Sequence, residues 1–104
     1  MFNAKTTRVV AAPTSVAAGA ATSVADLLSV TAAIVGSFTA TYQLQACFDG
    51  SGTTFTNVGS AQTSAGNVTV PDGATHVRWN CTAYTSGTPT SGVGGVRSTL
   101  GGGI

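Results

Sequence analysis

The clearest pattern along the chain is a strict alternation of apolar and polar side chains between Ser37 and Phe48. Phe, Ala, Tyr or Leu occupies each even-numbered position of this segment, whereas Thr and Gln occupy most of the odd-numbered ones. Successive side chains of a β-strand point to opposite faces of the sheet, and a helix would scatter both sets around its axis. The pattern therefore predicts a long strand with one apolar face.

A second alternating segment begins at His76, and here the apolar side chains fall on odd-numbered positions from Val77 to Ala83. Between the two segments, Asp49–Gly52 and Pro71–Gly73 have the composition of tight turns, because glycine accepts positive φ and proline cannot continue a ladder. Further strands are predicted at Thr7–Ala12, Phe55–Ser60, Asn67–Val70 and Val93–Leu100.

Two other segments are less regular. Thr85–Gly92 contains Ser-Gly-Thr-Pro and is predicted to be a loop. Val24–Val30 is compatible with a strand, although its first residues are equally compatible with one helical turn. The pattern leaves these two alternatives open.

Six to eight short strands separated by turns, with no amphipathic helix between them, predict an all-β fold. The expected architecture is a small antiparallel β-sandwich, Ig-like or jelly-roll-like, or a partly open barrel. The large core residues are predicted to be Phe38, Tyr42, Leu44, Phe48, Phe55 and Trp79.

The length of 104 residues suits a single domain. We expect an extended N-terminal arm over residues 1–13, a sandwich domain over 14–100 and a flexible glycine-rich tail over 101–104. With four basic and three acidic residues and a formal charge of +1, the chain lacks the electrostatic attraction that nucleic acid or an anionic membrane would require. No stretch of about 18 apolar residues is present to suggest a membrane span.

Candidate chemistry is sparse. Asp49 and Asp72 each precede a glycine, as expected of turn residues, and the single histidine has no neighbouring metal-ligand spacing. Cys47 and Cys81 lie on opposite phases of their strands, which predicts two separate thiols rather than a disulfide. We therefore predict no catalytic residue, no metal site and no cofactor.

Four segments carry a resemblance to a known family: Phe38–Gln45, Asp49–Gly59, Val68–Trp79 and Ala83–Thr88. In this order, an alternating strand leads through an Asp-Gly hairpin into an aromatic-containing strand, and a Val-Arg strand ends in Tyr-Thr-Ser-Gly-Thr. The arrangement resembles the small β-sandwich structural proteins of tailed bacteriophages.

The resemblance implies a non-enzymatic virion protein, made in the host cytoplasm and placed on the capsid exterior. Its expected role is that of a decoration or cement protein, which binds and stabilises the lattice of the major capsid protein. It implies homo-oligomers, most simply a trimer over a local threefold axis of the capsid. The alternative is a carbohydrate-binding or tail-fibre adhesion module, in which Tyr84, the Thr85–Thr90 loop and Trp79 stack on a host glycan.

The expected interface follows from this reading. Residues 1–13 are predicted to become ordered only on assembly and to add backbone hydrogen bonds to a neighbouring subunit or shell protein, as in β-augmentation. The side chains predicted to take part in the interface are Phe2, Lys5, Arg8, Val9, Tyr84 and Arg97.

Overall fold

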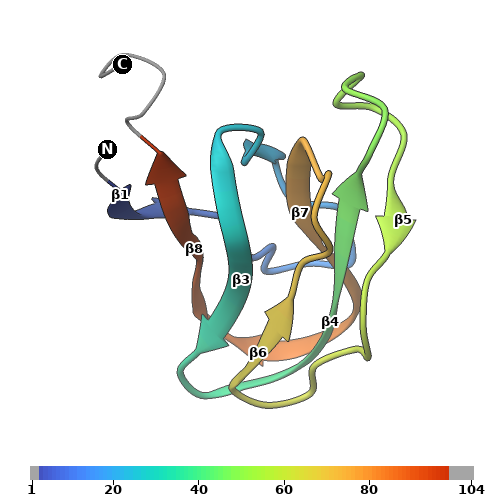
Figure 1. Cartoon of the computed structure of the whole chain (residues 1–104). Coiled ribbons are helices and arrows are strands. Elements are labelled where there is room, and N and C mark those ends of the chain that lie inside the picture. Colours follow the sequence, from blue (N-terminus) through green and yellow to red (C-terminus); the bar gives the residue numbers. More distant parts are fainter. Residues whose placement is uncertain (1–2, 99–104) are drawn as a thin grey trace.

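Two antiparallel sheets of four strands each pack face to face in the computed structural model, which describes residues 3–98 (Figure 1). Sheet A has the strand order β1-β8-β3-β6 and sheet B the order β2-β7-β4-β5. The predicted all-β antiparallel sandwich is confirmed. The strands are β1 (Asn3–Val9), β2 (Thr22–Ser23), β3 (Leu27–Val35), β4 (Phe38–Cys47), β5 (Thr56–Asn57), β6 (Gly66–Thr69), β7 (His76–Gly87) and β8 (Thr90–Ser98).

The two alternating segments form β4 and β7, which pair at the centre of sheet B. Leu44 lies opposite Trp79, and Tyr42 lies opposite Cys81; all four side chains are buried. Sheet A covers them with small and branched side chains, of which Ile34 is the largest that is fully buried. The predicted inward phase of both strands is therefore confirmed, and Trp79 is the largest fully buried side chain among residues 3–98.

Two of the predicted core aromatics lie elsewhere. Phe48 is 44% exposed, because β4 ends at Cys47 and the alternation no longer fixes the direction of the next side chain. Phe55 is half-buried and stacks on the guanidinium of Arg78, 4.0 Å from the ring centroid. The core prediction was wrong for Phe48, and Phe55 packs at the surface of sheet B rather than between the sheets.

The segments with weak sequence signals also differ from expectation. Of Phe55–Ser60, only Thr56 and Asn57 form a strand with β4. The predicted loop Thr85–Gly92 is almost entirely strand, because β7 continues to Gly87 and β8 begins at Thr90. Gly87, with φ of +103°, makes possible the tight connection by which the chain passes from β7 of sheet B to β8 of sheet A.

The segment left open between strand and helix contains a turn followed by a strand. Leu27 donates its backbone N–H to the carbonyl of Val24 at 3.0 Å, which closes a four-residue turn before β3. The register of β3 against β8 then shifts between Leu28 and Thr31, and Ser29 adopts a positive φ of 55° at this bulge.

The two cysteines are free, as predicted, and both are buried. Cys81 faces the core beside Trp79, whereas Cys47 belongs to the opposite phase of β4 and is covered by the loop that follows the strand. The Asp49–Gly52 turn supplies this cover, and its two glycines have the positive φ that the sequence indicated.

The N-terminal segment differs from the predicted arm. Asn3–Val9 form β1, which pairs with β8 of the same chain from Asn3 opposite Ser98 to Val9 opposite Gly92. The glycines of β8 permit this approach: a Cβ at Gly92 would lie 2.9 Å from the backbone oxygen of Arg8. Residues 1–2 and the predicted tail 101–104 lie outside the described residues.

Candidate functional site

The most distinctive surface is the outer face of sheet A, the side turned away from sheet B. Its residues alternate with the buried ones: Ala32 and Val93 are a buried pair, so the adjacent pair, Ala33 and Gly92, faces outward. The large apolar side chains exposed on this face are Val9 on β1 (82% exposed) and Leu28 and Val35 on β3 (57% and 50%).

A groove crosses this face along β8. Gly92 and Gly94 have no side chains, so the surface is low between the flanking strands β1 and β3. The hollow over Gly92 has a volume of about 270 Å³, and Thr7, Val9, Ala33 and Val35 are among the residues that line it. The groove is therefore apolar with hydroxyl groups at its rim.

The outer face of sheet B has a different character. Arg78 donates from Nε to Oε1 of Gln45 at 2.8 Å and stacks on Phe55. Gln43 donates from Nε2 to the backbone carbonyls of Leu44 and Val58, both at 3.0 Å. These three polar side chains bind one another or the backbone, so the apolar face of sheet A stands out by contrast.

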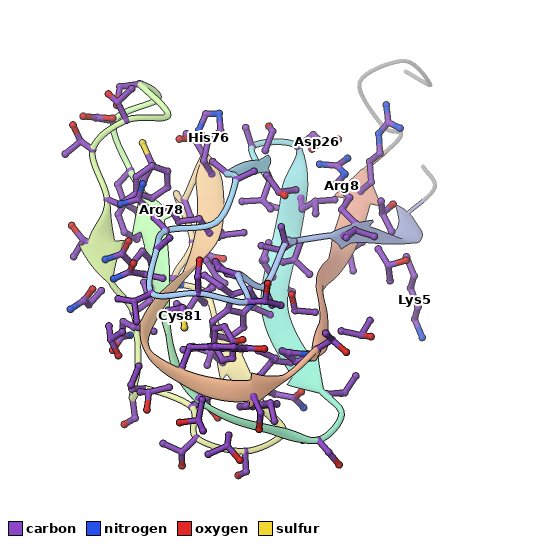
Figure 2. The ribbon with its side chains drawn as sticks, turned by 180° about the vertical axis from the view of Figure 1, so that it is seen from behind. Lys5, Arg8, Asp26, His76, Arg78 and Cys81 are labelled. Atoms are coloured by element: carbon purple, nitrogen blue, oxygen red, sulfur yellow. The ribbon has the colours of Figure 1, made fainter. Side chains whose placement is uncertain are left out.

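An ion pair fixes the inner side of β1 to the body of the sandwich. Arg8 donates from Nη1 and Nη2 to the two carboxylate oxygens of Asp26, at 2.6 and 2.7 Å, and from Nη1 to the carbonyl of Ser23 at 2.8 Å. Arg97 lies 3.5 Å from the same carboxylate. Figure 2 shows Arg8 and Asp26 together at one end of the sandwich, whereas Lys5 points away from the body. The hydrogen bonds from Arg8 lower the pKa of Asp26 to about 2.

Acidification is expected to release this ion pair. Because the pKa of Asp26 lies below its ordinary value of 3.8, its stabilising contribution is present above about pH 4 and is lost as the pH falls towards 2. The Asp26→Asn variant should remove that contribution at neutral pH and speed amide exchange in β1. NMR titration of the side-chain carboxyls checks the pKa, and a midpoint near the ordinary value would contradict the geometry.

The structure places four of the predicted interface residues on two neighbouring strands but not on one face, because Arg8 and Arg97 face Asp26 and Val9 faces outward. Lys5, Arg8 and Val9 lie on β1, and Arg97 lies on the neighbouring β8. Tyr84 is separate: it lies on β7 in sheet B, where its hydroxyl donates to the carbonyl of Gly87. Phe2 falls outside the described residues.

Sequence reasoning missed Leu28, Val35 and the groove between β1 and β3. Val35 carried a weak signal as an apolar residue next to the buried Ile34, but the sequence alone does not reveal which strands lie beside it. Only the pairing with β8 places Val35 at the groove, because Val35 lies opposite Thr90, two residues before Gly92.

A second cluster lies at the end of β4. Asp49 accepts hydrogen bonds from the thiol of Cys47 (Sγ–Oδ1 3.0 Å) and the N–H of Ser51 (2.9 Å), and the bonding from Ser51, followed by that from Cys47, lowers its pKa to about 2. Thr75 bonds Nδ1 of the adjacent His76 at 3.0 Å. These contacts hold the loop over the strand, and residues 3–98 contain no group of three or more His, Cys, Asp or Glu side chains that could hold a metal.

Within the described part of the chain, no helix has the length and apolar character needed to cross a membrane. Comparisons with protein families, with curated proteins and with solved structures find no match to this chain.

Proposed function

We propose that this protein is a structural binding module that attaches to another protein through the outer face of sheet A. In its most specific form, the proposal is a capsid decoration protein of a tailed bacteriophage, bound to the lattice of the major capsid protein. The general form rests on the surface just described, and the specific form rests on the sequence resemblance to phage sandwich proteins.

The observation that carries the proposal is the exposed apolar face with its groove. Val9, Leu28 and Val35 are large apolar side chains that β1 and β3 expose to solvent. No described segment folds over them. Exposed apolar side chains beside a groove are typical of protein interaction sites, and Val9 and Val35 line this one, whereas Leu28 lies at the other end of β3. Lys5 is the one charged residue of β1 that shares this outward phase. Because the apolar side chains outnumber this single charge, a largely uncharged partner surface fits best.

Low charge supports a role in which many copies sit close together. A formal charge of +1 on 104 residues keeps repulsion between neighbouring copies small. Proteins that cover a repeating surface need this property, because each copy lies within a few Debye lengths of others.

The structure does not offer the aromatic rings that the glycan-binding alternative requires. Trp79 is fully buried, so it cannot stack on a sugar, and the hydroxyl of Tyr84 donates to the carbonyl of Gly87 on the same strand. The shallow hollow on sheet B near Thr39 and Thr85 is lined by Thr and Ala without an aromatic ring. We therefore favour a protein partner.

The specific form is tested on purified particles of the phage that encodes the chain. Quantitative mass spectrometry should find this protein at a fixed, high ratio to the major capsid protein, and particles lacking it should lose resistance to heat. Absence from the particle, or a few copies confined to the tail, would reject the capsid role. The general proposal, attachment through the outer face of sheet A, is tested separately by the Val35→Lys variant.

A charge placed on the groove should abolish attachment. Val35→Lys puts an ammonium group into the proposed interface without a partner, which costs more than the ~1.4 kcal/mol that corresponds to tenfold in affinity. Particle occupancy, or affinity for the isolated shell protein, should fall at least about tenfold. The matched control is Thr82→Lys, at an exposed position on β7 of sheet B, which should bind as the native chain does. Equal loss in both variants would contradict the assignment of the face.

A further inference from the structure

We propose that the free edge of β1 pairs with the same edge of a second copy of this chain, antiparallel and about a two-fold axis that passes beside Thr6. The proposal concerns a different surface from the outer face and does not depend on it. It names the partner as the chain itself, joined by backbone hydrogen bonds.

The four sheet edges of the described residues differ in what they offer. β2 and β5 are two residues long, and β6 has four residues and is followed closely by Pro71. β1 has seven residues in an unbroken register with β8, without proline or bulge. Short strands, prolines and bulges are the usual protections of a sheet edge, so β1 is the edge best able to accept another strand.

The register shows which backbone groups are available. Val10 donates its N–H to the carbonyl of Ser91 at 3.3 Å and lies opposite it in the continued β1–β8 register. Groups that point to the same neighbour recur at every second residue of an antiparallel strand, so the even-numbered residues of β1 face β8 and the odd-numbered ones face away. Lys5 and Thr7 therefore direct both N–H and C=O to the free edge.

The free edge ends at Val9. Thr22 donates its hydroxyl to the carbonyl of Val9 at 3.0 Å, and the chain then crosses to sheet B, where Gly19 binds the carbonyl of Trp79. An added strand thus has room beside the first part of β1 and not beyond Val9. This limit matters for the choice of register.

Symmetry restricts the pairing further. A two-fold axis perpendicular to the sheet pairs residues of the same face, so it must pass beside one residue of each strand. An axis at Lys5 would place two ammonium groups opposite each other, and an axis at Arg8 would do the same with two guanidinium groups. An axis at Thr7 would carry the second strand past Val9.

An axis at Thr6 avoids all three conflicts. It places Lys5 of each copy opposite Thr7 of the other, and both residues direct their backbone groups to this edge, which gives four inter-chain hydrogen bonds. Arg8 lies opposite Ala4, and its charge is already held by Asp26. The pairing extends sheet A into one eight-stranded sheet, in which the two outer faces lie side by side.

Sedimentation equilibrium of the full chain tests the pairing. The native protein should show a concentration-dependent dimer, and Thr7→Pro should reduce it to a monomer at the same concentrations. Proline removes the outward N–H of residue 7 while the β8-facing bonds of residues 6 and 8 remain. Thr7→Val, which keeps the N–H, is the control and should dimerise as the native chain does. A native monomer at every concentration, a native trimer, or an unchanged dimer with Thr7→Pro would overturn the proposal.

Oxidative cross-linking tests the register and stays informative if the proline variant fails to fold. At the axis, the two Cα atoms of residue 6 form a non-hydrogen-bonded pair about 4.5 Å apart, within the range of a disulfide. Thr6→Cys should therefore form a covalent dimer under mild oxidation, whereas Thr7→Cys should give little. Cross-linking of Thr7→Cys in preference to Thr6→Cys would exclude this register.

Discussion

Replacing Trp79 by Ala is expected to lower the free energy of unfolding by about 3–5 kcal/mol. The indole is fully buried between the two sheets and lies opposite Leu44, so its removal leaves a cavity that the central strands of sheet B cannot close. Small domains have a total stability of about 5–15 kcal/mol, so the variant should be close to unfolded at ambient temperature. Urea titration followed by circular dichroism measures the change.

The matched variant is Trp79→Phe. The indole N–H has no hydrogen-bond partner among the described residues, so this substitution removes an unsatisfied polar group and keeps a ring in the core. We expect a smaller loss than for the Ala variant. Equal losses would show that a phenyl ring does not restore the packing of the indole, and a Trp79→Ala protein that melts with the native chain would place the indole outside the core.

Replacing Gly87 by Ala is expected to be the second most damaging change, at about 2–5 kcal/mol. Gly87 has a φ of +103°, which an L-residue adopts only with strain. A Cβ there would lie 2.6 Å from Cα of Phe38 and 2.7 Å from the carbonyl oxygen of Ser37, so the end of β7 would have to move away from β4. The melting temperature should fall by several degrees or more.

Gly73→Ala separates the two causes. Gly73 has nearly the same φ, +98°, but no atom lies within 4 Å of the position that its Cβ would take. Its substitution should cost only the backbone strain, about 1–2 kcal/mol. Equal effects of the two substitutions would mean that the end of β7 moves freely and that its close packing on β4 contributes little.

The parts of the fold that could be predicted are those where burial imposes a period. β4 and β7 are buried on one face over their central length, so alternation fixed which side chains point inward, and it also placed Cys47 and Cys81 on different faces. Turns with Asp-Gly and Pro-Asp-Gly were equally clear, because only a few residue types tolerate their backbone angles.

Other features depend on neighbours that the sequence does not display. Phe48 is one residue past the end of β4, and there the loop decides its direction. The segment from Thr85 to Gly92 has the composition of a loop, but pairing with β4 and β3 makes all of it strand except Thr88 and Pro89. The apolar and polar residues of β1 alternate only weakly. The glycines of β8, far along the chain, allow β1 to pair there and so to join sheet A.

The same reason explains why the candidate surface was only partly predicted. Lys5, Arg8 and Val9 were expected at an interface because they lie near the N-terminus, whereas the partner strand that makes Val9 part of a groove came from the opposite end of the chain. The role of Asp26 as the anchor of β1 also required the fold, because its partner Arg8 lies 18 residues away in the sequence.

Hydroxyl-radical footprinting of the protein, free and bound to the protein partner proposed for the outer face of sheet A, tests the central claim most directly. The account predicts protection of Val9, Leu28 and Val35 on the outer face of sheet A, with Phe55 and Gln45 on sheet B labelled equally in both states. Protection confined to sheet B, with unchanged labelling of the three apolar residues, would contradict it.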